Sequence, residues 1–395
     1  MDPNTYIATV ARYNGGRSEN ENVLVSGSDA IVSEYMLAGI VEGCAKSGAM
    51  PVLIDNGEFI NSPTAGVLAL HGYKPENLLS GDICIFDPLK ISAITGMTRM
   101  RQLTGVFAFD EQKKLKLISY LNLLSMLDKA IAGNSEGLTV SKIIVDYGSG
   151  TSIEMKLQEL VDGGLIDEAQ QIEFLAKYAE VADVAPEFDG ILFCLNPFVD
   201  SEKSKLTHSA RIAAVLPLSE LNGDDTLKAA LLKLLLFSLK ELGAEPIHVI
   251  ITDSGLKPCA PLVDFISSVP TVIGMSLITS DAFMLGDKTA LSSIQNRFPI
   301  RVYSSHNAES SLSAIEEALG GHEVVMTTYT VSRDRRLGAN KPVDWLFGTN
   351  KTEIYGQTPP TYKPRYRKED IAALPNGTAI VQYRGQSCIV SCRQK

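Results

Sequence analysis

Short apolar runs alternate along this chain with longer stretches in which apolar residues recur every three or four positions. Runs of the first kind are typical of strands buried on both faces, and stretches of the second kind are typical of amphipathic helices. The runs Val23 to Val25 and Pro51 to Ile54 flank one helical stretch, which predicts a strand, a helix and a second strand. Further runs that predict strands lie at 80–86, 190–195, 211–218, 248–253, 271–279, 300–305 and 322–331. This alternation predicts an α/β fold with a mainly parallel sheet and helices on both faces.

A long helical stretch divides the chain into three parts. Residues 110–187 show helical spacing almost throughout, and we interpret them as a mostly helical insertion. Residues 1–109 and 188–395 then form the N-terminal and C-terminal parts of one α/β domain. Two apolar stretches on either side of Arg384 and Gly385 predict a terminal β-hairpin with these two residues at its turn.

The most apolar stretch, Thr226 to Leu242, is interrupted by three lysines. Charged side chains within a stretch of this length are costly inside a membrane. We therefore expect a buried helix of the α/β domain and no membrane insertion.

The composition is that of a globular protein with an acidic balance. The 395 residues carry a formal charge of −10, so contact with nucleic acid would need a local basic patch and is not supported by the overall charge. The six cysteines form no CxxC pair, and the start at Met1 lacks the basic and apolar regions of a signal peptide. We therefore expect a reducing, cytoplasmic setting. The five histidines show no spacing typical of a zinc site, and no metal is expected.

The segment SGSDAIVS, residues 26–33, follows the first strand and has the layout of a phosphate-binding loop. The working motif, G-x-x-x-x-G-K-[ST], wraps phosphates in backbone N–H groups and adds a lysine and a hydroxyl. Here Ser26, Ile31 and Val32 stand where the two glycines and the lysine belong, and only Ser33 matches. The same segment also suits a simple strand-to-helix turn in which Ser28 or Asp29 caps the helix.

Three later strand ends carry related signals. The second strand ends at Asp55 and is followed by Glu58, and the strand at 248–253 ends at Asp253, which is followed by serine. The strand at 271–279 ends in Thr279 and is also followed by serine.

The order of these elements resembles that of the P-loop ATPases of the FtsK/HerA lineage, including the coupling and assembly ATPases of conjugation and type IV secretion. The resemblance implies a RecA-like sheet, with Ser26, Gly27, Ser28 and Ser33 as the remains of the nucleotide loop. It also implies that Asp55 and Glu58 belong to the family's acidic turn, that Asp253 is the Mg²⁺-holding acid, and that Arg297 or Arg301 is offered to a neighbouring subunit.

The resemblance also implies lost catalysis. The loop lysine and glycine, the acid after Asp253 and the glutamine expected after Thr279 are all missing. The β-branched Ile31 would also hinder the approach of backbone N–H groups to a phosphate. We therefore expect a pseudo-ATPase without a cofactor, acting as a structural or regulatory subunit of a conjugative DNA-transfer or secretion assembly. Its expected partner is a second copy in a ring-type homo-oligomer, or a related active ATPase.

Two alternatives stay open. The first is an active ATP hydrolase whose loop departs from the usual motif, with Ser33 and Asp253 holding Mg²⁺. The second is a Rossmann-type methyltransferase that uses the loop Gly148 to Ser152 after a strand ending at Asp146. The second lacks a clean acidic residue about 20 positions downstream, where this fold usually has one.

Overall fold

The computed structural model describes residues 22–55, 63–80, 83–84, 110–132, 143, 147, 150–195, 204–209, 211–221, 225–242, 245–253, 260–286, 288–324, 327–332, 352–357 and 361–392. They fall into two compact units. Unit 1 comprises the described residues up to Ser304 and from Asn376 onward, and unit 2 comprises those from Ser305 to Pro375.

Unit 1 contains a nine-stranded sheet with the strand order β15-β14-β9-β1-β8-β7-β2-β6-β3. Its strands are β1 (Val23–Ser26), β2 (Met50–Asp55), β3 (Lys74–Asn77), β6 (Ile212–Pro217), β7 (Ile247–Asp253), β8 (Gly274–Thr279), β9 (Ile300–Tyr303), β14 (Thr378–Tyr383) and β15 (Gln386–Ser391). All pairs from β9 to β3 are parallel, whereas β14 is antiparallel to both β9 and β15. The predicted mainly parallel sheet is thus confirmed.

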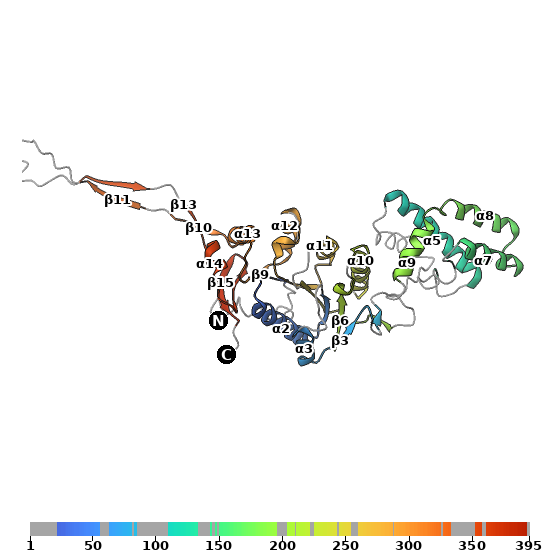
Figure 1. Ribbon diagram of the computed structural model, residues 1–395, viewed down its shortest axis with the longest axis horizontal. Helices are drawn as coiled ribbons and strands as arrows, with labels where there is room; N and C mark the ends of the chain where they lie inside the picture. The colour runs from blue at the N-terminus through green and yellow to red at the C-terminus, as the bar shows by residue number, and fades with distance from the viewer. Residues whose placement is uncertain are drawn as a thin grey trace, which may run out of the picture. The chain divides into compact units, whose positions relative to one another are not determined.

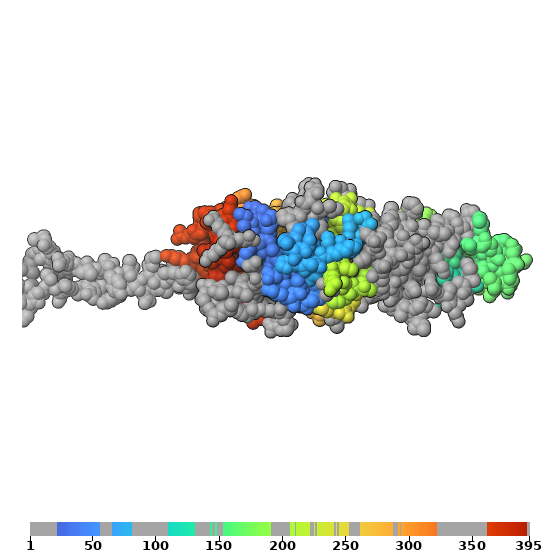
Figure 2. Space-filling view, turned by 90° about the horizontal axis from the view of Figure 1, so that it is seen from below, coloured from blue at the N-terminus to red at the C-terminus, as the bar shows by residue number. Residues whose placement is uncertain are grey.

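Helices cover both faces of this sheet (Figure 1). On one face α2 (Ala30–Ser47) and α3 (Pro63–Leu70) share a core with alternate strand residues such as Val25. On the other, α10 (Asp225–Leu242), α11 (Ala260–Ser268) and α12 (Lys288–Arg297) share a core with residues such as Leu24. Successive strand residues point to opposite faces, so the continuous apolar runs serve both cores. In Figure 2 the surface formed by α2 and α3 is blue.

The terminal hairpin and the apolar helix are also confirmed. β14 and β15 are joined by Arg384 and Gly385, whose φ angles of 48° and 79° are typical of a tight hairpin turn. The helix predicted at 226–242 is α10. Among the helices that the structure describes, none is long and apolar enough to cross a membrane.

The predicted insertion is helical where it is described. It contains α5 (Glu111–Ala132), α7 (Gly150–Asp162), α8 (Glu168–Ala179) and the start of α9 (Ala185–Leu195), which continues past the predicted end of the insertion. The buried ring of Tyr120 on α5 lies 6.2 Å from the ring of Tyr178 and 6.3 Å from that of Phe188. The prediction of a strand at 190–195 is wrong, because these residues complete α9. A short apolar run has no period that separates a strand from the end of a buried helix.

In unit 2 the strand pairing differs from the prediction. The run at 322–331 was expected to continue the parallel sheet, but it contributes to two separate antiparallel pairs. β10 (Gly321–Val324) pairs with β13 (Thr361–Pro364), and β11 (Thr327–Ser332) pairs with β12 (Thr352–Gln357). An apolar run predicts a strand but not its distant partner. The helices of this unit are α13 (Glu309–Leu319) and α14 (Lys368–Ala372).

Two short strands, β4 and β3, differ from the sequence prediction. The run predicted at 80–86 is represented by β4 (Ile83–Cys84), which pairs with β5 (Ser204–Lys205) outside the main sheet. The edge strand β3 reads Lys-Pro-Glu-Asn and has no apolar pattern. Proline and charged residues are typical of edge strands, where they oppose pairing with other chains.

Candidate functional site

The sheet register brings most of the predicted site residues to one edge. Ser26 at the end of β1 is level with Thr279 of β8, and Thr279 is level with Asp253 of β7. On the next strand, Asp55 is level with Thr252. The carboxyl ends of parallel strands form the usual ligand edge of open α/β sheets. The side chain of Asp253 and the whole of Glu58 lie outside the described part of the chain.

The turn after β1 is short, because α2 begins at Ala30, inside the segment that aligns with the phosphate loop. Gly27 has a φ of 146°, a backbone conformation that favours glycine. Its N–H donates to the carbonyl oxygen of Thr279 at 3.1 Å. A Cβ atom at Gly27 would overlap the Oγ of Ser304. The glycine is therefore required by close packing of the turn against two neighbouring strand ends.

Asp29 caps α2, as one of the two interpretations of this segment predicted. Its Oδ1 accepts hydrogen bonds from the N–H groups of Ile31 at 2.9 Å and Val32 at 3.4 Å. Its Oδ2 accepts the N–H of Gly377 at 2.6 Å, and the side chain is buried. The first N–H groups of a helix are the groups that bind phosphate in nucleotide loops. Here they bind a carboxylate of the chain itself, and that negative charge would repel a phosphate.

The serines around Asp29 are also engaged by neighbouring segments. The Oγ of Ser26 accepts the N–H of Ala282 at 3.0 Å, and the Oγ of Ser304 accepts the N–H of Asp29 at 3.4 Å. Ser28 is exposed, and the half-buried Ser33 lies in the first turn of α2, where its N–H donates to the carbonyl of Asp29. The backbone around the turn is therefore held mainly by other parts of the same chain.

Three of these partners, Ser304, Ala282 and Gly377, were missed by the sequence interpretation. Pro375, Asn376 and Gly377 do form a turn signal. That signal does not reveal a contact with Asp29, because the two residues are 348 positions apart.

Asp55 is 3% exposed at this edge. The Oγ1 of Thr252 donates to Oδ1 of Asp55 at 2.9 Å. In the residues that the structure describes, no group of three or more histidine, cysteine, aspartate or glutamate side chains is placed to hold a metal ion.

Both candidate intersubunit arginines cap helices. The Nη2 of Arg297 donates to the carbonyl oxygens of Val269 and, at 3.4 Å, of Pro270, just past the end of α11. Arg301 donates from Nη2 to Gln295 at 2.8 Å and from Nε to Phe298 at 3.1 Å, at the end of α12. A guanidinium at a helix C-terminus satisfies carbonyl groups and the helix dipole. A role between subunits stays a prediction for both residues.

The glycine-rich loop at 148–152 does not follow a strand in the described residues. Ile143 and Tyr147 have helical backbone, and Gly150 begins α7. The residues just before Asp146 lie outside the described part of the chain, and the described residues on either side give the methyltransferase alternative no support. Gly148 and Ser149 lie outside the described residues.

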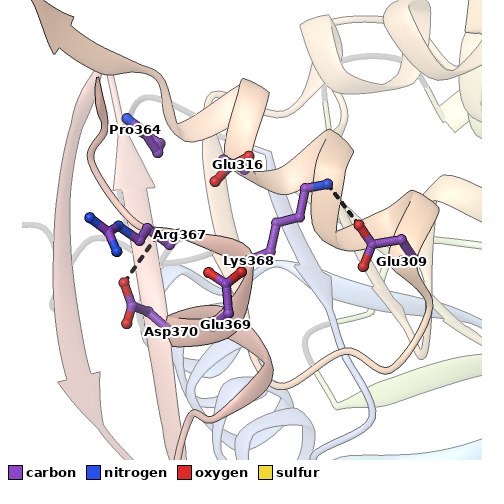
Figure 3. A pocket seen from close by; sticks show the side chains of 7 residues that line it. All are labelled: Glu309, Glu316, Pro364, Arg367, Lys368, Glu369 and Asp370. Atoms are coloured by element: carbon purple, nitrogen blue, oxygen red, sulfur yellow. Dashed lines mark hydrogen bonds and ion pairs between the residues drawn. The ribbon is translucent and has the colours of Figure 1, made fainter. Parts of the chain in front are cut away.

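An open hollow of about 540 Å³ lies in unit 2 between α13 and α14 (Figure 3). It is lined by Glu309, Glu316, Pro364, Arg367, Lys368, Glu369 and Asp370. Lys368 forms an ion pair with Glu309 at 2.7 Å, and the backbone N–H of Arg367 donates to Asp370 at 3.1 Å. Because these charged side chains serve contacts within the unit, the hollow is a less specific candidate than the edge of the sheet.

The sequence matches no family model and no curated protein. Solved structures do match its fold. The bacterial conjugative coupling protein TrwB, lacking its N-terminal 70 residues, aligns with a TM-score of 0.53 at 12% identity, over 95% of this chain and 86% of that one. The plasmid coupling protein TrwB in complex with ADP and Mg²⁺ aligns with a TM-score of 0.54 at 14% identity, over the same shares. VirB4 of Thermoanaerobacter pseudethanolicus aligns with a TM-score of 0.54 at 10% identity, over 95% and 89%.

The chain has the fold of TrwB and VirB4. The resemblance drawn from four degenerate strand ends is confirmed at the level of the fold, which is a P-loop NTPase-like α/β fold.

Proposed function

We propose that this protein is a catalytically degenerate P-loop ATPase-like subunit with a structural or regulatory role in a conjugative DNA-transfer or secretion assembly. The fold shared with a coupling protein and with VirB4 supports the type of assembly. The expected partners are further copies of the chain or a related active ATPase, in the cytoplasm, and the protein needs no cofactor.

The carboxylate of Asp29 at the start of α2 is the observation that carries this proposal. It accepts two helix N–H groups and the N–H of Gly377. A nucleotide phosphate would have to displace this buried anion and break all three contacts. It would also meet the buried, apolar Val32 in place of the loop lysine.

The second candidate is an active ATPase that binds ATP and Mg²⁺ in an unusual way. The register that places Asp253, Thr279 and Ser26 level on adjacent strands favours it. In that case Ser33 and Asp253 would hold the metal ion. The two candidates differ in nucleotide binding and in ATP hydrolysis.

Titration of the full chain with a fluorescent ATP analogue, with and without Mg²⁺, tests the proposal. We expect no saturable binding up to about 1 mM of the analogue. A dissociation constant of about 1 mM corresponds to a binding free energy of roughly −4 kcal/mol. Ser33→Ala is the diagnostic variant, and Ser47→Ala, at an exposed position at the far end of α2, is its control. Mg²⁺-dependent binding that Ser33→Ala abolishes and Ser47→Ala preserves would contradict the proposal, and release of inorganic phosphate from ATP would then establish the second candidate.

The proposed role in an assembly needs a separate measurement. We expect the tagged protein to co-purify with an ATPase of the same transfer or secretion element when both are expressed together. If it neither binds that ATPase nor self-associates, the assembly role is excluded.

A further inference from the structure

The charge of this chain is strongly segregated along the sequence. Residues 110–195, which contain the helical insertion, carry seven lysines and fifteen acidic residues, a net charge of −8. The segment 361–368 carries four lysines and arginines and no acidic residue, a net charge of +4. A chain with an overall charge of −10 therefore contains one strongly acidic part and one short basic part.

The acidic insertion exposes apolar side chains as well as charge. Met155 on α7, Leu165 in the connection and Ile172 on α8 are 60%, 60% and 67% exposed. α8 has no fully buried side chain. The same helices expose the carboxylates of Glu159 and Glu173, each in a local ion pair with a lysine of its own helix. Covering these apolar side chains with a partner is favourable, because it removes apolar surface from water.

The basic part includes β13 and the turn after it, in unit 2. Tyr362 is 60% exposed, and Arg365 and Arg367 are also exposed, with Lys363 half-buried between them. Tyrosine and arginine are the residue types enriched among the energetically dominant contacts of interfaces. Lys368, the last basic residue of this part, is already paired with Glu309.

We infer that the helical insertion of one copy binds the basic segment around β13 of a second copy. The inference rests on the proposed assembly role and adds to it the two surfaces that meet. Opposite charges attract the two parts over about one Debye length, and the exposed Tyr362 and the apolar side chains of α7 and α8 supply the contact area. Because the two surfaces differ, the contact is heterologous, and successive copies add head to tail into a closed ring or an open chain.

The test uses full-length chains with charges reversed on one surface at a time. The basic-segment variant is Lys363→Glu, Arg365→Glu and Arg367→Glu, and the insertion variant is Glu159→Lys, Asp162→Lys and Glu173→Lys. A control with the same change in net charge as the insertion variant is Glu34→Lys, Glu245→Lys and Asp264→Lys, at three exposed positions outside both surfaces. Mass photometry or sedimentation at micromolar protein gives the size of each species, and circular dichroism checks folding.

We expect the wild type and the control to self-associate in about 50 mM salt and to dissociate in about 500 mM, because added salt screens the attraction. Each surface variant alone is expected to be a monomer. Mixing the two variants makes the two intact surfaces available to each other and also sets the two reversed surfaces against opposite charge, so it is expected to restore association.

A wild type that stays monomeric at low salt would overturn the inference, as would variants that associate like the control. Folded variants that are monomeric alone and do not pair when mixed would also overturn it. None of these outcomes changes whether nucleotide binds, so the inference and the pseudo-ATPase proposal can fail separately.

Discussion

The carboxylate of Asp29 joins the start of α2 to Gly377, 348 residues further along the chain. One of its oxygens accepts the N–H groups of Ile31 and Val32, and the other accepts the N–H of Gly377. The segment that leads into the terminal hairpin is thereby tied to the turn where a P-loop protein would hold its nucleotide.

Replacing Asp29 by alanine is expected to destabilise unit 1 by about 1 to 3 kcal/mol. The change removes a helix cap and leaves the N–H of Gly377 without its acceptor. Urea denaturation of the full chain measures the loss. Glu34→Gln, on α2 and exposed, should stay within about 0.5 kcal/mol of the wild type. Equal stability of the two variants would contradict the role given to Asp29.

Gly27→Ala is expected to cost more than 2 kcal/mol, an order of magnitude typical of a clash combined with backbone strain. The added Cβ would overlap the Oγ of Ser304, and the φ of 146° is unfavourable for alanine. Gly48→Ala is the matched control, because Gly48 also has a positive φ of 70° but no atom within 4 Å of its Cβ position. Urea midpoints compare the two. Adding Ser304→Ala should recover part of the loss at Gly27 and none at Gly48.

The buried His248 predicts a loss of stability in mild acid. Burial lowers the pKa of His248 to about 4, below its ordinary value of 6.5. The unfolded chain therefore takes up a proton before the folded chain does, so stability falls as the pH drops from about 6.5 towards 4. His248 is buried in β7, and its Nε2 lies 2.8 Å from the Oγ of Ser276.

Urea midpoints at pH 7.5 and pH 5 measure this effect. His248→Gln is expected to flatten the pH dependence between these values, although it also lowers stability at pH 7.5 by disturbing the core. His71→Gln, at a partly exposed position, should leave the slope unchanged. A slope that persists in His248→Gln would assign the effect to another group.

The sequence predicted most of the strands of the sheet but not the elements that are only partly buried. Strands such as β7 and β8 are continuous apolar runs because both of their faces are buried, and this signal is local. α9 was mistaken for a strand, since its apolar end is short, and β3 was missed, since an edge strand needs no apolar pattern. Local patterns therefore predict elements well where burial is complete and poorly where it is partial.

The candidate site shows the same limit. The cap at Asp29 could be predicted from the residues that follow it, because capping depends on neighbouring N–H groups. Its second contact, with Gly377, depends on β14 pairing with β9, which in turn pairs with β1. Helix capping by Arg297 and Arg301 was likewise not predicted, because an arginine carries no local sign of which carbonyl it will reach.

The opposite pH dependence is expected from Asp189 on α9. Burial raises the pKa of Asp189 to about 6, from an ordinary value of 3.8, although the hydroxyl of Tyr120 donates to the carboxylate at 3.3 Å and partly offsets this. The folded chain therefore holds this proton more tightly than the unfolded chain, and the stability it contributes is lost as the pH rises from about 4 to 6. Asp189→Asn keeps an acceptor for Tyr120 and removes the charge, so it is expected to stabilise the protein at pH 8 and to match the wild type near pH 3.5.

The exposed Asp183→Asn serves as the control, because the ion pair with Lys116 lowers rather than raises the pKa of Asp183. Thermal unfolding followed by circular dichroism at both pH values compares the three proteins. An Asp189→Asn variant that is less stable than the wild type at pH 8 would show that the ionised carboxylate stabilises the folded protein.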